Sequence, residues 1–168
     1  SFDAIMEAER PFATDPVTQG HLVGVASALA VYRVWQADGI NAAEAKARTR
    51  LPTIALWRRT TRVMMWLMVI FSKDAFEAVR RYSRDRTANA LGPSLAFHLE
   101  DSPDGFVSEV TTCGYRAFFT RHGAEELLGL FCEWDRTWIE ALPGGIRFHR
   151  PPPQAQGGAT CRFEFRRD

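Results

Sequence analysis

The spacing of apolar residues changes from helical to twofold at Gly92-Pro93. Before that point apolar residues recur at the period of a helix, as they do over residues 16–38. After it, apolar and polar residues alternate over 95–100, a Ser-Pro-Asp-Gly turn follows, and 106–113 returns as a second strand. The sequence therefore predicts a helical N-terminal half followed by a β-hairpin.

The helical half divides at its caps and its prolines. Asp15 precedes a proline, which suits a helix N-terminus, and Asn41 precedes a glutamate by three residues, as in a capping box. We expect Pro52 to separate a short helix from a long one, because proline interrupts helical hydrogen bonding. The expected helices cover 16–38, 42–50, 53–71 and 75–86, and residues 1–14 are free to form an extended arm.

The expected helix over 53–71 is apolar on nearly every side and rich in methionine and tryptophan. Such a pattern is typical of a helix buried on more than one side, so we interpret it as core. The alternative is a ligand pocket or a contact with another subunit, and the arginine-rich segment that follows extends this candidate surface for a protein partner over 53–86. We interpret the arginines between 80 and 86 themselves as a solvated helix face, because acidic residues lie among them.

The segments after the hairpin complete a sheet. Residues 115–122 and 124–142 predict two helices, and 146–150 and 160–166 predict two further strands. The predicted fold is α+β: a helical N-terminal half packed on an antiparallel sheet of about four strands, with two helices inserted between the hairpin and the last two strands. With 168 residues we expect a single domain over 1–168.

Charge and hydropathy exclude several classes of partner. The formal net charge is +1, so no concentrated basic surface for nucleic acid is expected. The most apolar run, 63–71, has about half the length of a membrane-spanning helix. The first residues lack the pattern of a signal peptide, and the three cysteines, without a CxxC pair, indicate reduced thiols. We expect a cytoplasmic protein, with an organelle matrix or stroma, reached by removal of a targeting segment, as the alternative.

The three cysteines lie in three different predicted elements of the last third of the chain. Cys113 ends a strand before a helix, whose N-terminus should lower the pKa of the thiol. Cys132 and Asp135 lie one turn apart on the flank of an apolar helix face, and Cys161 shares the inward side of the last strand with two phenylalanines. The pattern allows a cluster of thiols beside a carboxylate. Three interpretations stay open: an inert core, a nucleophilic site and a metal site.

Charged residues near this cluster extend the set of candidates. His122 falls at a helix end, where it is either an acid–base group or simply a C-terminal cap. Asp135 needs a partner if it is buried, because an unpaired buried carboxylate is costly. The candidates for that ion pair are Arg136, Arg150 and Arg162.

Two segments carry a resemblance to a known family. The run CGYRAFFTRHGAEELLGLFCEWDRTW, followed by FHR and GGATCRFEF, resembles the L-2-amino-thiazoline-4-carboxylic acid hydrolases (ATC hydrolases). The upstream stretch ALAVYRVWQADGINAAEAKA is similar to the N-terminal helix pair of that family. The resemblance implies a hydrolase of non-peptide C–N bonds that opens a small cyclic amidine. In the family this amidine is the thiazoline ring of a cysteine precursor, and the product is an N-carbamoyl amino acid.

The resemblance also implies a mechanism. Either a thiolate attacks the ring carbon while a carboxylate or an imidazole moves protons, or a divalent metal held by thiolates and a carboxylate supplies a water molecule. Apart from that metal, no cofactor is expected, and the expected partner is a small-molecule substrate. Residues and resemblance together give Cys113, Cys132, Asp135, Cys161 and His122 as catalytic candidates, and Arg150, Gly157 and Gly158 as substrate-binding candidates.

Three positions depart from the family pattern. Arg162 follows the last cysteine, where the family commonly has an acid, and Gly114 follows the first, where proline is common. Residues 151–153 are prolines, where the family has hydroxyl-bearing residues. An arginine beside Cys161 would reverse the charge expected there. These departures support the alternative of a non-catalytic member of this fold, a pseudoenzyme that acts as a subunit of a larger complex or as a small-ligand-binding module.

Overall fold

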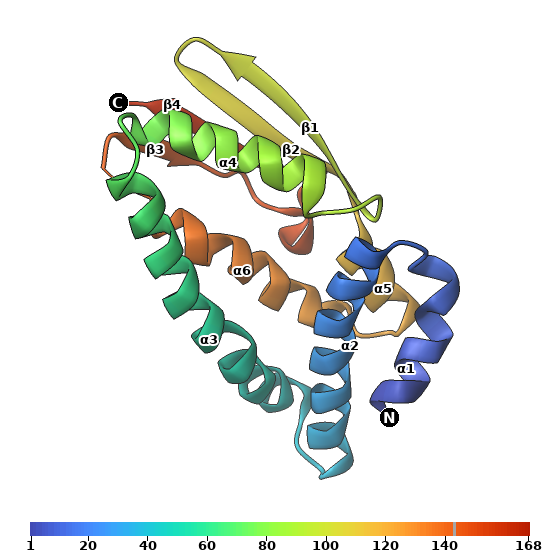
Figure 1. Cartoon of the computed structure of the whole chain (residues 1–168). Helices are drawn as coiled ribbons and strands as arrows, with labels where there is room; N and C mark the ends of the chain where they lie inside the picture. Colours follow the sequence, from blue (N-terminus) through green and yellow to red (C-terminus); the bar gives the residue numbers. More distant parts are fainter. Residues whose placement is uncertain (143) are drawn as a thin grey trace.

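The computed structural model describes residues 1–142 and 144–168, without the side chains at positions 51, 53 and 55–57. The helical first half, the hairpin and the two helices before the last two strands confirm the expected α+β architecture (Figure 1). The helix expected over 124–142 is shorter and starts with a 3-10 turn. The elements are α1 (Phe2–Glu9), η1 (Arg10–Phe12), α2 (Pro16–Ala37), α3 (Ala42–Ile70), α4 (Ala75–Asn89), β1 (Leu95–Ser102), β2 (Gly105–Cys113), α5 (Gly114–Arg121), η2 (Glu125–Leu127), α6 (Leu128–Ile139), β3 (Ile146–His149), η3 (Gln154–Gln156) and β4 (Cys161–Arg167).

The four strands form one antiparallel sheet in the order β1-β2-β4-β3, so the last strand of the chain lies between the hairpin and β3. Across β2 and β4, Phe106 pairs with Phe165 and Val110 pairs with Cys161. Because side chains alternate along a strand, these four residues share one face of the sheet, and each is at most 6 % exposed. The sheet therefore has one inner face, on which the rest of the molecule packs.

Two apolar clusters form the interior. One joins α1, α2, α5 and α6 around Leu29, Phe119 and Leu127, which are fully buried. The other fills the space between the inner sheet face, α4 and α6, and includes the fully buried Met65 of α3 and Val79 of α4. Helix α6 contributes to both clusters, and Figure 1 shows it in the middle of the molecule, with α3 on one side, α2 on the other, and α4 and the sheet above it.

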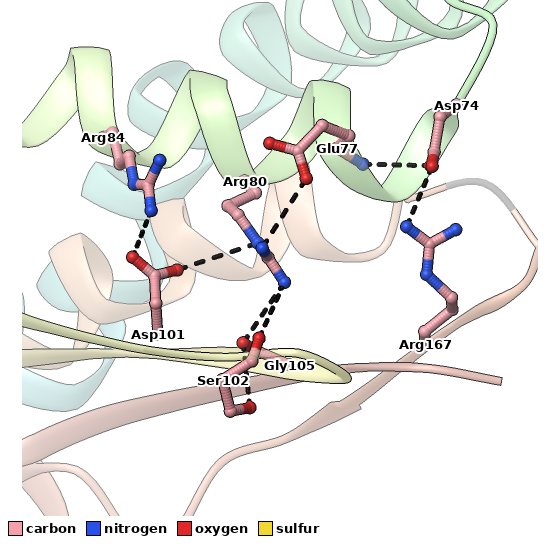
Figure 2. A network of polar contacts seen from close by, with 8 residues as sticks. All are labelled: Asp74, Glu77, Arg80, Arg84, Asp101, Ser102, Gly105 and Arg167. Atoms are coloured by element: carbon pink, nitrogen blue, oxygen red, sulfur yellow. Dashed lines mark hydrogen bonds and ion pairs between the residues drawn. The ribbon is translucent and has the colours of Figure 1, made fainter.

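Arginines of α4 hold this helix against the hairpin (Figure 2). Arg80, whose side chain is 15 % exposed, donates hydrogen bonds to the carbonyl oxygens of Ser102 (3.1 Å) and Gly105 (3.3 Å) at the hairpin turn. Arg84 forms an ion pair with Asp101 of β1. The interpretation of these arginines as a solvated face is therefore wrong for Arg80, which connects the helix to the sheet.

Pro52 does not break the helical half in two. α3 runs without interruption from Ala42 to Ile70, although proline lacks the N–H that would bond to the carbonyl one turn earlier. Both sides of Pro52 are anchored by packing: Ala45 and Thr49 before it are almost completely buried, and so is Met65 after it. The loss of one hydrogen bond is smaller than the stabilisation from this burial, so the helix continues.

Residues 1–14 do not form an extended arm. α1 and η1 fold against the rest of the chain, with Ile5 and Glu9 each only 3 % exposed. The Glu9 carboxylate forms an ion pair with Arg121 of α5, and His122 Nε2 lies 3.1 Å from Glu9 Oε1. These two contacts fix the N-terminal helix to the end of α5.

The second half of α3 is not the buried core helix that its composition predicts. Met65 is buried, but α3 lies at the edge of the molecule (Figure 1), so its other sides have no covering element. Leu56 and Trp57, part of the same prediction, have side chains outside the described residues. None of the described helices is at once long and apolar enough to span a bilayer. The exposed apolar side chains of this half are Val63, Met64, Trp66, Leu67, Ile70 and, just after it, Phe71.

Candidate functional site

Cys113 lies where the two apolar clusters meet and packs against both. It ends β2 and is the N-cap residue of α5. The backbone passes close to Ser94 here: a Cβ atom on Gly114 would lie 2.7 Å from the Ser94 carbonyl oxygen. Only glycine fits at such a distance, so the departure from the family pattern at Gly114 has a local steric cause.

The pKa of the Cys113 thiol is raised, mainly by burial and further by the charges of Cys161 and Asp135. The backbone N–H groups of Arg116 and Tyr115 act in the opposite direction but are outweighed. The expectation that the helix N-terminus lowers this pKa is therefore wrong. The free energy lost when the thiolate is removed from water exceeds the stabilisation that the first N–H groups of α5 give it.

Cys132 and Asp135 lie one turn apart on α6, as their spacing predicts. The pKa of the Cys132 thiol is raised to about 12, first by burial and then by the charges of Cys161 and Asp135, against a lowering effect of Arg150. Cys113 also acts on Cys132 in this way. The three thiols and Asp135 are thus close enough for the charge of one group to change the pKa of another.

Asp135 lies between two arginines. Its Oδ1 is 3.6 Å from Arg86 Nη2, and its Oδ2 is 3.7 Å from Arg150 Nη2. Burial nevertheless raises the pKa of Asp135, because the loss of hydration outweighs the two cations, which lower it. The carboxylate borders a cavity of about 20 Å³ that Ser83 and Ser108 also line. That volume accommodates one water molecule.

Arg150 connects Asp135 to the neighbourhood of Cys132. Its side chain is 11 % exposed, its Nη1 donates a hydrogen bond to the Cys132 carbonyl oxygen (3.2 Å), and its guanidinium lies 4.4 Å from the ring centre of Phe163. Its Nε and Nη2 have no hydrogen-bond partner in the part of the chain that the structure describes. Nη2 faces Asp135 in their ion pair, so Nε is the donor of Arg150 that is left without a polar partner.

The loop between β3 and β4 covers Cys161. The backbone N–H of Gln154 donates to Cys161 Sγ at 3.3 Å. Gly157 has a φ of +88°, and a Cβ atom on Gly158 would lie 1.9 Å from the Pro152 carbonyl oxygen, so both positions require glycine. The glycine pair therefore shapes the loop over Cys161, and its part in substrate binding stays a prediction.

A cleft of about 730 Å³ opens between α3, α6 and this loop. Cys132 and Arg150 line it, and Lys46, Arg50 and Arg136 add positive charge. Arg50 and Arg136 each pair with a glutamate, whereas Lys46 forms no ion pair with any described residue. The volume suits a small molecule, and the excess of cations suits an anionic one.

The family comparison agrees with this arrangement. The model of the L-2-amino-thiazoline-4-carboxylic acid hydrolase family matches residues 27–165, which is most of the chain and includes all three cysteines and Asp135. The chain belongs to this family. Membership confirms the resemblance and supports a hydrolase-like assignment. Searches of curated proteins and of solved structures find no match.

Two positions singled out by comparison with ATC hydrolases lie away from the thiols. His122 pairs with Glu9, and its ring centre lies 4.6 Å from that of Phe118. Arg162 lies on the outer face of the sheet, where its Nε is 2.7 Å from Glu164 Oε1. Because neighbouring residues of a strand face opposite sides, Arg162 does not place a positive charge next to Cys161. A catalytic role for His122 stays a prediction, and the site described above does not include it.

The thiols and Asp135 do not form a metal site among the described residues. Among residues 1–142 and 144–168, no three His, Cys, Asp or Glu side chains are arranged to hold a metal ion. Of the three expected partners of Asp135, Arg150 is confirmed. Arg136 pairs with Glu140 instead (3.2 Å), and Arg162 faces the other side of the sheet.

Sequence reasoning did not identify Arg86, Lys46 or the pair Tyr115 and His21. The Tyr115 hydroxyl is 2.6 Å from His21 Nδ1, and His21 Nε2 is 2.8 Å from the Ala90 carbonyl oxygen. Because a carbonyl can only accept, Nε2 carries the proton and Nδ1 accepts from the tyrosine. Burial raises the pKa of Tyr115, and the charge of Asp135 adds to this. The position of Tyr115 two residues after Cys113 is the one signal that the sequence offers for it.

Proposed function

We propose that this protein hydrolyses a small cyclic amidine that carries a carboxylate, with Cys132 as nucleophile and Asp135 as base. One observation carries the proposal: Cys132 lines a cationic cleft together with Arg150, which pairs with Asp135 one turn away on the same helix as Cys132. Membership of the ATC hydrolase family supports hydrolysis as the reaction class. The cations of the cleft, Lys46 among them, support a small anionic substrate.

Protonation states determine the first step. Cys132, whose pKa is about 12, is a neutral thiol near neutral pH and needs a base to become a nucleophile. The raised pKa of Asp135 makes this carboxylate a stronger base than an ordinary aspartate. As the sulfur attacks the amidine carbon, its proton passes to Asp135 and the C=N electron pair moves to nitrogen. The electron pair on nitrogen then re-forms the C=N bond as the bond from that carbon to the ring sulfur breaks, and Asp135 returns the proton to the leaving sulfur.

Water completes the reaction. It attacks the same carbon, Asp135 accepts its proton, and the bond to the Cys132 sulfur breaks as that proton returns to the sulfur. One water molecule is added overall, an N-carbamoyl amino acid leaves, and no electron donor or acceptor is needed. In this scheme Arg150 holds the substrate beside the sulfur, and Lys46 holds its carboxylate.

Turnover of 2-amino-thiazoline-4-carboxylate tests the proposal. We expect Cys132→Ser to lower kcat by about 10³-fold or more, because a hydroxyl is a far weaker nucleophile in this position. The melting temperature should change little, since Cys132 is only half-buried and water can reach a hydroxyl there. Cys113→Ser is the matched control, a second half-buried thiol whose replacement should lower kcat by less than about tenfold. A large loss of stability with unchanged turnover in Cys132→Ser would contradict the assignment.

The exposed side of α3 supports a second candidate function, the binding of another protein subunit. Trp66 is 60 % exposed, Ile70 53 % and Phe71 84 %, and they follow one another along the same helix end. Contiguous apolar side chains of this size are typical of contact surfaces between proteins. We take a second copy of this chain as the partner to be tested first.

Light scattering during gel filtration measures that association. We expect Trp66→Ser to shift the protein to the mass of a monomer, because large aromatic residues supply much of the binding energy in such contacts. Val34→Ser is the control, since Val34 is equally exposed (58 %) but lies on α2. A wild-type protein that stays monomeric at every concentration tested contradicts this function.

A further inference from the structure

A second cavity lies on the other side of α6. It has a volume of about 490 Å³ and is enclosed by α2, α3, α4 and α6. None of the residues that line it also lines the cationic cleft. Its volume is within the range of small-molecule sites in proteins. The proposed reaction makes no use of this cavity.

Aromatic rings form one wall of this cavity. Trp134 and Trp138 of α6 line it one turn apart, and Tyr82 of α4 lies edge-on to Trp138, with 6.1 Å between ring centres. Trp138 is 8 % exposed, and its indole Nε1–H has no hydrogen-bond partner among the described residues. A buried donor without a partner is unfavourable, and an oxygen atom of a ligand in the cavity would remove that cost.

Helix α2 contributes two glycines to the lining of the cavity. Gly20 and Gly24 of α2 lie one turn apart and line the cavity, and no other atom lies within 4 Å of the position that a Cβ would take at either glycine. Glycine is less favourable than alanine inside a helix, and no close contact requires it at these two positions. What the two glycines provide is open space beside the helix, because neither carries a side chain.

Arg86 is the arginine among the described residues that line the cavity. Arg86 lines the cavity, its guanidinium lies 5.9 Å from the ring centre of Trp138, and the described lining contains no Asp or Glu. The other basic group of the lining, His21, already uses both ring nitrogens in contacts with Tyr115 and Ala90. Arg86 pairs with Asp135 through Nη2 (3.6 Å), and its remaining N–H groups are the ones that would receive a negative charge.

We infer that this cavity binds a small planar aromatic carboxylate. Its ring lies between the backbone of Gly20 and Gly24 and the indole of Trp134. Its carboxylate accepts hydrogen bonds from Arg86 and from Trp138 Nε1. The inference concerns binding alone and does not depend on the reaction assigned to the cationic cleft.

Calorimetric titration with indole-3-acetate tests the inference on the full chain. We expect saturable binding with a Kd below about 1 mM. Tryptamine has the same ring but a positive charge, and it should bind at least about tenfold more weakly because Arg86 repels it. Absence of indole-3-acetate binding, or equal binding of the two compounds, overturns the inference.

Filling the cavity is the decisive test of its location. Gly24→Leu projects a side chain into the open space and should weaken binding of indole-3-acetate by at least about tenfold. The neighbouring exposed position supplies the control: Val23→Leu on the same helix should change the Kd by less than about twofold. Because leucine favours helix more than glycine does, Gly24→Leu should melt no lower than the wild type. Unchanged binding in Gly24→Leu overturns the inference; if that variant fails to fold, the same comparison with Gly24→Ala and Arg86→Gln decides it.

Discussion

Helix α6 separates two hollows of opposite character. On the side of the closing loop, Cys132 and Arg150 line a cleft rich in cations. On the side of α2 and α4, Trp134 lines a cavity with an aromatic wall. Asp135 lies between them, 3.6 Å from Arg86 of the aromatic cavity and 3.7 Å from Arg150 of the cleft. A single helix thus serves two different chemical environments, with one carboxylate in contact with both.

The geometry of a helix explains this separation. Cys132 and Trp134 are two residues apart, which corresponds to about 200° around the axis, so they face opposite hollows. Asp135 falls between these directions and is the residue that both arginines reach. The same residue therefore links the proposed reaction to whatever occupies the aromatic cavity, because a change at either arginine alters the charge around the carboxylate.

The largest effect is expected from Asp135→Asn. The amide keeps the shape of the carboxylate but cannot accept the proton of Cys132, so kcat should fall by about 10²- to 10⁴-fold. Steady-state turnover of 2-amino-thiazoline-4-carboxylate measures this. Glu133→Gln is the matched control, because Glu133 is the acid two residues earlier on α6 and pairs with Arg50 at 2.6 Å at the mouth of the cleft. If both variants lose the same activity, a general loss of charge and not a specific base explains the result.

A second experiment, with effects of intermediate size, should distinguish the roles of Arg150 and Arg86. Arg150→Gln removes a charged donor from the cleft, which should raise KM by roughly 10- to 100-fold. Arg86→Gln should change KM by less than about threefold, because Arg86 faces the other cavity. For binding of indole-3-acetate, Arg86→Gln should raise the Kd more than Arg150→Gln does. Equal effects of the two variants on KM would mean that the two hollows do not function separately.

The sequence predicts the fold better than it predicts the site. Caps at Asp15 and Asn41, and the change from helical to twofold spacing at Gly92, are local signals, and the structure has the corresponding elements. The predicted break at Pro52 is wrong because contacts with the rest of the fold override a local signal. The local preference of Pro52 is outweighed by the packing of α3 on α2 and α6, which are separate elements of the chain, and no local pattern contains that information.

For the site as well, local spacing could be predicted from the sequence and contacts between distant segments could not. The spacing of Cys132 and Asp135 places them one turn apart, which a sequence can reveal. The partner Arg86 comes from α4, whose basic residues look like any solvated face, and the burial that raises the pKa of Cys113 depends on two clusters meeting there. Apolar composition likewise predicts burial for α3 although half of it lies at the edge of the molecule, since composition does not tell which element covers which.

The smallest expected effect is on the pH dependence of stability. The pKa of Asp135 in the folded chain is raised above its ordinary value of 3.8, so above that pH the folded state retains the proton longer than the unfolded chain does. Stability from this group therefore falls as pH rises from 3.8 toward the raised pKa, by at most about 1.4 kcal/mol per pH unit. Asp135→Asn lacks this contribution. The difference in free energy of unfolding, wild type minus variant, should decrease over that interval.

Urea denaturation at a series of pH values measures that difference, and it also ranks the two arginines. Both lower the pKa of Asp135, with Arg86 the larger of the two. Removal of either cation should raise the pKa further and extend the interval over which stability falls, more in Arg86→Gln than in Arg150→Gln. A difference that stays constant with pH would show that the pKa of Asp135 is not raised, and one that grows as pH rises would show that the folded state stabilises the carboxylate. Asp135 would then be an ordinary ion-pair partner, without the raised basicity that the proposed reaction requires.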